Sequence, residues 1–173
     1  MSLLEITIAV ALLVTGLLSF MQAMMMLERS HARAREVGRA TQAARRVVEA
    51  IQAEAFAEAF RRYNGDAADD PGGAGSAPGK NFAVPGLSAR ANDPDGFPGE
   101  VIFPSPAGQP SVLRENVVDT QLGMPRDLDG DGLVSAVTDC ATTYRLLPVR
   151  VRVDWVGPSG PGTVSMRTMI GNF

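Results

Sequence analysis

The sequence predicts an α+β fold: a long N-terminal helix, transmembrane and then amphipathic, packed on a small antiparallel sheet with long loops rich in glycine and proline. Three observations predict it. Residues 6–27 carry no charge, all 12 prolines and 16 of the 18 glycines lie after Tyr63, and apolar residues alternate near the C-terminus. Helix breakers are therefore confined to the part of the chain that reads as loops and sheet.

The first segment, residues 1–27, is predicted to be a transmembrane helix. Its 22 uncharged residues from Ile6 to Leu27 would span about 33 Å as a helix, enough to cross a hydrocarbon core of about 30 Å. A signal peptide is the alternative, but its apolar core is shorter and follows a basic start, whereas this chain begins Met-Ser-Leu-Leu-Glu.

Residues 28–63 are predicted to continue the same helix with an amphipathic pattern. Apolar side chains recur at helical spacing at Val37, Ala40, Ala44, Val47, Ile51 and Ala55. Asn64 and Gly65 then supply a stop, because both tolerate the left-handed conformation that ends helices. The prediction is one helix of about 60 residues, about 90 Å long.

Residues 64–173 are predicted to form a globular head. Residues 64–110 read as a long loop, with a short strand near Glu100–Phe103. Residues 144–170 read as a hairpin, because Val149, Val151, Val153 and Trp155 alternate with polar residues. Trp155 is expected to lie in the core.

Composition argues against several functions. Net charge is −3 and the early arginines alternate with glutamates, so no nucleic-acid site is evident. The single cysteine, Cys140, excludes an intrachain disulfide and is expected to be a buried thiol. With one histidine and no phosphate-binding glycine loop, the chain is not expected to be an enzyme.

Glu5 is the most informative single residue. A carboxylate at the start of a membrane helix costs several kcal/mol if it is buried without a partner. The helix's own N-terminal N–H groups could satisfy it as an ordinary interfacial glutamate. The functional alternative is that it pairs with the α-amino group of Met1 on a neighbouring copy and sets the register of bundled helices.

These residues carry a family resemblance. Met1-Ser2-Leu3-Leu4-Glu5 followed by an apolar run resembles the mature N-terminus of type IV pilins and type II secretion pseudopilins, and Gly16-Leu17-Leu18 with the C-terminal hairpin is most similar to the minor-pilin branch. Met1 stands where the family usually has Phe, and Gln22 where many major pilins have a helix-bending proline.

The resemblance implies a structural subunit of an extracellular filament with a pilin-like fold. Prepilin peptidase would cut before Met1, the new amine would be methylated, and residues 1–27 would form a helical homo-oligomer with the help of the pilus assembly machinery. The protein would lie in the bacterial inner membrane before assembly and then at the cell surface. Against that orientation, Arg29, Arg33, Arg35 and Arg39 directly follow the apolar run, and such a flank favours the cytoplasm.

Two alternatives to a major filament subunit stay open. Within the family, the chain could be a minor pilin or pseudopilin that primes or tips a pilus or secretion machine. From another class, it could be a monomeric, single-pass anchored module that binds its ligand in a calcium-dependent way.

The second motif resembles the first half of an EF-hand calcium loop, within residues 127–139. Asp127, Asp129 and Asp131 occupy positions one, three and five, and Gly132 position six. The predicted Ca²⁺ ligands are completed by the Leu133 carbonyl, by Ser135, and by Asp139 or a distant carboxylate such as Asp119 or Glu115. The bound ion would stiffen the head. The alternative is a solvated acidic turn.

Overall fold

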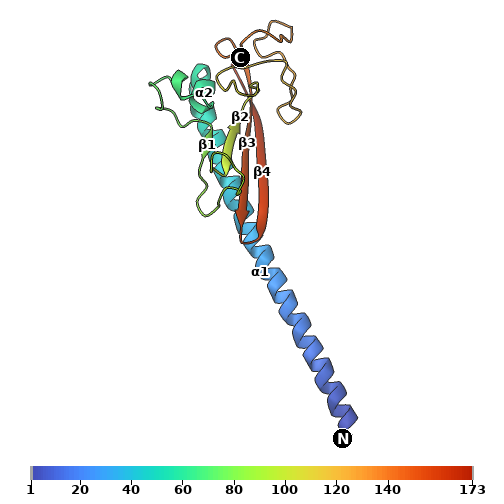
Figure 1. Cartoon of the computed structure of the whole chain (residues 1–173). Coiled ribbons are helices and arrows are strands. Elements are labelled where there is room, and N and C mark those ends of the chain that lie inside the picture. The colour runs from blue at the N-terminus through green and yellow to red at the C-terminus, as the bar shows by residue number, and fades with distance from the viewer. Residues whose placement is uncertain (1, 173) are drawn as a thin grey trace.

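The structure, a computed structural model that describes residues 2–172, is an α+β protein in which a long helix carries a small antiparallel sheet. Helix α1 runs from Leu3 to Ala53 and projects far beyond the head, so the N-terminus lies at the opposite end of the molecule from the loops (Figure 1). Ser2 caps it, its hydroxyl accepting the Leu4 N–H at 3.3 Å.

The predicted single helix to Tyr63 is interrupted. Glu54 is extended, with ψ of 158°, and a second helix, α2, occupies Phe56–Tyr63. The Tyr144 hydroxyl lies between the main-chain groups that an unperturbed helix would join, donating to the Phe56 carbonyl and accepting from the Phe60 N–H. A side chain distant in sequence therefore binds the first turn of α2, directly after the interruption.

The sheet has four antiparallel strands in the order β1-β2-β3-β4. Strands β1 (Asn81–Phe82) and β2 (Gly99–Ile102) are short, whereas β3 (Leu146–Gly157) and β4 (Gly160–Gly171) pair along their whole length. The predicted strand near Glu100 and the predicted hairpin are both present. A short 3₁₀ turn, Ala67–Asp69, follows α2.

The core lies between β3 and the second half of α1. Val149, Val151, Val153 and Trp155 are at most 1% exposed, which confirms the predicted inward face of β3. From the helix come Ala40, Ala43, Ala44 and Ile51. Alanines let the helix backbone approach the sheet closely, so the large Trp155 ring fits between them.

The inward stripe of α1 differs from the prediction at its first position. Val37 is 36% exposed, whereas its neighbour Glu36 is only 4% exposed. A carboxylate is tolerated there because it accepts hydrogen bonds from Trp155 Nε1 at 3.3 Å and from the N–H and hydroxyl of Ser159. Glu36 thus joins α1 to the tip of the β3–β4 hairpin.

Trp155 depends on the glycine opposite it in the hairpin. Gly162 pairs with Trp155 in register, and a β-carbon at Gly162 would overlap the indole ring. We therefore expect Gly162→Ala to lower the free energy of unfolding by about 1–3 kcal/mol through overpacking. Urea unfolding of the full chain in detergent, followed by Trp155 fluorescence, measures this.

The matched control is Gly38→Ala. A β-carbon at Gly38 meets nothing within 4 Å, and alanine favours a helix over glycine by up to about 1 kcal/mol. Gly38→Ala should leave stability unchanged or raise it. Equal losses in both variants would contradict the packing described for Gly162.

Candidate assembly helix and candidate metal loop

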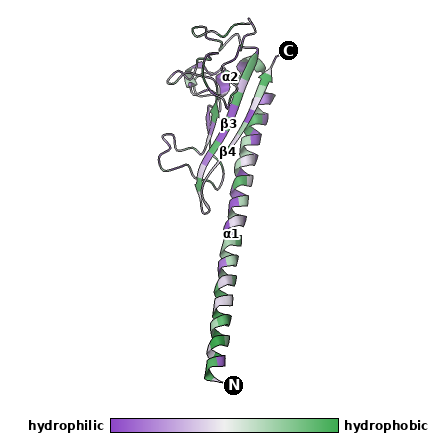
Figure 2. Ribbon diagram, turned by 90° about the vertical axis from the view of Figure 1, so that its right-hand side faces the viewer, coloured by the Kyte–Doolittle hydropathy of each residue, from purple (hydrophilic) through white to green (hydrophobic). Residues whose placement is uncertain are grey.

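The first half of α1 has no partner in the head. Every residue from Ser2 to His31 is exposed, although the segment includes an 18-residue window of mean hydropathy 2.2. By length and composition α1 can cross a membrane. In Figure 2 the ribbon of α1 is mostly coloured as hydrophobic toward the N-terminus and becomes mixed in polarity before the sheet begins. Lipid or other protein chains would have to cover this surface.

Glu5 lies in the first turn of this segment and is exposed. No salt bridge to Glu5 occurs among residues 2–172. In this first turn negative charge is stabilised by the helix dipole. The proposed partner atom, the Met1 amine, belongs to a residue outside the described part of the chain.

The tip of the β3–β4 hairpin binds α1 at Arg33 and at Glu36, and we call the bonds of Glu36 to Ser159 and Trp155 the Glu36 contact. Arg33 donates to the Pro161 carbonyl at 3.1 Å, one turn before Glu36 meets Ser159. The Ser159 hydroxyl is the main cause that holds the pKa of Glu36 below its ordinary value, outweighing burial, and the Ser159 N–H, Trp155 and the Arg33 charge add to it. Glu36 therefore stays ionised at the base of the head.

The acidic loop is irregular chain at the end of the head distant from the N-terminus (Figure 1). Asp127, Asp129 and Asp131 each offer a carboxylate oxygen, and these oxygens lie within 4.8 Å of one another, a group that could hold a metal ion. Asp127 accepts the N–H groups of Gly130 at 2.6 Å and Gly132 at 2.8 Å. These bonds lower the pKa of Asp127, so it remains an anion.

Asp139 and Glu115, two of the carboxylates considered for completing the ligand set, are placed differently around the loop. Asp139 turns away, its Oδ1 accepting from the N–H groups of Leu113 and Ala141, and it is not part of the three-aspartate group. Glu115, 1% exposed, instead lies under the loop. Its Oε1 accepts from Leu128 at 2.7 Å and its Oε2 from Ser135 at 2.7 Å.

Glu115 organises the loop from below. Burial acts to raise its pKa, but the N–H groups of Ser135, Leu128 and Asp129 together bring that pKa below its ordinary value. The carboxylate thus joins Leu128 to Ser135 across the acidic loop. Asp119 is engaged elsewhere, 3.4 Å from Arg150.

The other two predicted ligands, Leu133 and Ser135, also lie in this loop. The Leu133 N–H donates to Asp131 at 2.7 Å, so this residue lies within the loop. The Ser135 hydroxyl is 2.8 Å from the Thr138 hydroxyl and also accepts from the Val137 and Thr138 N–H groups. A water between Ser135 and the ion, as at position nine of EF-hands, would fit this arrangement.

Cys140 lies beside the same loop. It is fully buried, as predicted, and with Glu115 and Asp129 it forms a second group that could hold a metal ion. Burial, followed by the charge of Glu115, raises the pKa of the Cys140 thiol to about 12. A thiol that stays protonated is a poor metal ligand, so the oxygen-only group of three aspartates fits a hard cation better.

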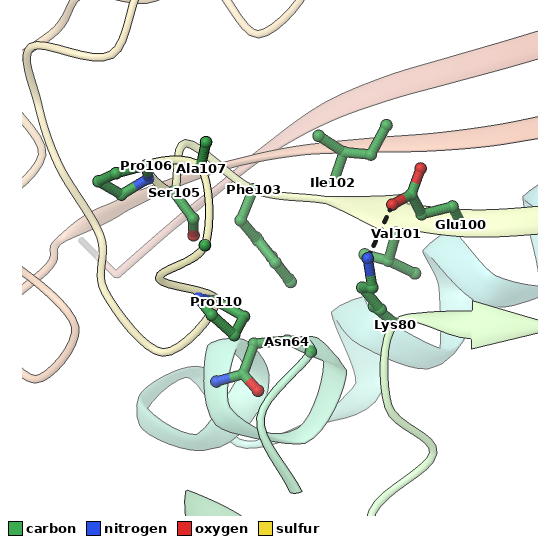
Figure 3. A pocket seen from close by; sticks show the side chains of 12 residues that line it. Asn64, Lys80, Glu100, Val101, Ile102, Phe103, Ser105, Pro106, Ala107 and Pro110 are labelled. Carbon is green, nitrogen blue, oxygen red and sulfur yellow. Dashed lines mark hydrogen bonds and ion pairs between the residues drawn. The ribbon is translucent and has the colours of Figure 1, made fainter. Parts of the chain in front are cut away.

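A hollow of about 470 Å³ lies between the end of α2, β2 and the loop 104–110 (Figure 3). Lys80 and Glu100 form an ion pair of 3.1 Å at its side, and Glu100 also binds Arg152 at 3.0 Å. The Ser105 hydroxyl lies here without a hydrogen-bond partner. Neither histidine nor cysteine is among the residues that line the hollow.

Comparisons of the chain with family models, with curated proteins and with solved structures each give no match.

The Glu36 contact predicts a defined pH dependence. A folded-state pKa below the ordinary glutamate value of 4.5 stabilises the head above that pH, and this stabilisation is lost as pH falls through the folded pKa. Glu36→Gln removes the titrating group, so its urea midpoint should fall less steeply than that of the wild type below about pH 4.5. Trp155 fluorescence measures it, since the indole bonds Glu36 directly.

Glu49→Gln is the matched control for this titration. It removes the same charge from an exposed position on α1. The expected result is the acid dependence of the wild type. If Glu36→Gln also kept the wild-type dependence, the contact with Ser159 would not couple protonation to folding.

Proposed function

We propose that this protein is a structural subunit of a pilin-like filament that assembles through its N-terminal helix. The observation that carries the proposal is that residues 6–27, all exposed, form an apolar surface on a helix that the head leaves free. In a bundle of such helices, burial of this surface against neighbouring copies supplies the driving force for assembly. The proposed mechanism is polymerisation of the subunits, without a catalytic step.

The continuity of α1 supports this proposal. The same helix that projects freely up to His31 is buried against the sheet from Glu36 onward. An assembly contact made by residues 6–27 would therefore fix the position of the head as well. Glu5 would supply register, because a carboxylate within an apolar bundle is satisfied only at the level of a positive group on a neighbour.

The head carries the second part of the proposal, a bound Ca²⁺. Calcium takes six to eight oxygen ligands in flexible geometry, and Asp127, Asp129 and Asp131 offer convergent carboxylates that no lysine, arginine or histidine pairs with among the described residues. Bound Ca²⁺ would relieve repulsion between these anions and stiffen the irregular chain around them.

Replacing Glu5 tests the assembly mechanism. In full-length chain transferred out of detergent, we expect Glu5→Gln to reduce filament formation at least tenfold, because about 1.4 kcal/mol per subunit contact already gives that factor. Electron cryo-microscopy and sedimentation of the polymer measure the result. Glu49→Gln, outside the free segment, should assemble as the wild type does.

Two outcomes would overturn the assembly proposal. One is a Glu5→Gln chain that assembles with wild-type yield and register. The other is a filament reconstruction with residues 6–27 outside the core. A wild-type chain that stays monomeric under all conditions that insert it in a membrane would favour the anchored binding module.

Calcium binding is tested by stability. At a Ca²⁺ concentration 100 times the dissociation constant, the free energy of unfolding should rise by about 2.7 kcal/mol. Asp131→Asn keeps an oxygen that can accept from Leu133 but loses a charge, and should remove most of this gain. Asp95→Asn, in another exposed loop, is the control. A Ca²⁺ response that Asp131→Asn leaves intact would place the ion elsewhere.

A further inference from the structure

A band of four exposed arginines lies on α1 directly after the apolar segment: Arg29, Arg33, Arg35 and Arg39. Two carboxylates, Glu28 and Glu36, are interleaved with them. Glu36 is buried and faces the hairpin, where Ser159 and Trp155 bind it. Glu28 is therefore the one exposed carboxylate in residues 28–39, so the surface of this stretch is net positive.

The tip of the β3–β4 hairpin and these arginines together line two shallow grooves. One groove is lined by Glu28, Arg29, His31, Arg35 and Pro158, and a second by Arg29, Arg33, Val37 and Ser159 among others. Arg33 is held in place by the Pro161 carbonyl, whereas Arg29 and Arg35 form no ion pair or hydrogen bond with the described residues. Their guanidinium groups are free to bind an anion.

The distance of these arginines from the apolar segment, measured along the helix axis, indicates which anion they meet. At 1.5 Å per residue, Arg29 lies about 3 Å and Arg35 about 12 Å beyond Leu27. A headgroup layer occupies about 5–8 Å on each side of the hydrocarbon core. Helical side chains tilt toward the N-terminus, so the long Arg35 side chain leans back into this layer.

We infer that the grooves on the two sides of Arg29 bind the phosphate of anionic phospholipid headgroups. The inference rests on the proposed function only in that residues 6–27 cross a membrane. Guanidinium groups bind phosphate through two parallel N–H bonds, and each arginine near a membrane surface favours an anionic over a neutral surface by about fivefold. Because either leaflet can supply the phosphate, the site does not depend on the orientation of the helix.

The test uses the full-length chain reconstituted in phosphatidylcholine bilayers. Spin-labelled phosphatidylglycerol and spin-labelled phosphatidylcholine are added in trace amounts, and the motionally restricted fraction of each gives their relative association with the protein. The wild type should prefer phosphatidylglycerol several-fold. Arg29→Gln/Arg35→Gln should remove most of this preference, so that the two lipids associate almost equally, and Glu28→Gln should raise it.

The matched control is Arg45→Gln/Arg46→Gln. It removes the same charge from exposed positions on the same helix, but about 27 Å beyond Leu27 and so beyond the screening length of about 8–10 Å. This control should keep the wild-type preference. Millimolar inorganic phosphate at constant ionic strength should also leave it unchanged, since free phosphate lacks the acyl chains that hold the headgroup at this height.

Three outcomes would overturn the inference. The first is equal association of the two lipids with the wild type. The second is an equal loss of lipid preference in the two double variants. The third is the formation of oligomers in neutral bilayers that dissociate in salt or in the Arg29→Gln/Arg35→Gln variant. The last would assign the band to the acidic head of a second copy. Carbonate extraction of the same vesicles separates these results from a failure of membrane insertion, and Glu5→Gln, which tests assembly, should leave the lipid preference unchanged.

Discussion

The packing of the inward face of β3 against the second half of α1 is the contact on which the rest of the molecule depends. The sheet is one layer with its inner face made by β3, and the second half of α1 covers that face. Without Ala40, Ala43 and Ala44 against it, the apolar side of β3 would be open to water, at about 25 cal/mol for each Å² exposed. The head is therefore not a domain attached to a helix, because the helix completes its core.

This shared core has a consequence for the free segment. Since α1 is helical without a break from Leu3 to Ala53, the direction of the exposed apolar part is fixed by the part that packs on the sheet. Gly16 and Gly38 lie in this helix without interrupting it, and Glu36 and Arg33 tie it to the hairpin tip. In a membrane, the hairpin tip would stand at a set height above the bilayer. In a filament, equivalent helix contacts would place all heads equivalently.

Local periodicity was sufficient to predict the elements but not their exceptions. The hairpin, the strand at Gly99–Ile102 and the buried Trp155 follow from alternation of apolar residues over a few positions. The break at Glu54 does not, because the hydroxyl that stabilises it belongs to Tyr144, 88 residues after Phe56. Burial of Glu36 also escapes a rule that puts charged residues outside, since its partners Trp155 and Ser159 come more than 100 residues later.

The same dependence on residues distant in sequence applies to the carboxylates around the acidic loop. Spacing identified Asp127, Asp129 and Asp131, but the carboxylate beneath them, Glu115, could not be chosen over Asp139 without the fold that brings residues 115 and 128 together.

The carboxylates of the sheet and those of the acidic loop have different kinds of partner. On the sheet, Glu100 and Asp154 each lie within 3.4 Å of a lysine or arginine nitrogen, and Asp119 meets Arg150 in the same way. In the loop, Glu115 and Asp127 instead accept from several main-chain N–H groups. Backbone dipoles lower the energy of each anion without removing its charge, so Asp127, Asp129 and Asp131 still repel one another. A divalent cation would stabilise all three at once, which is why we propose this loop, and not the sheet, as a Ca²⁺ site.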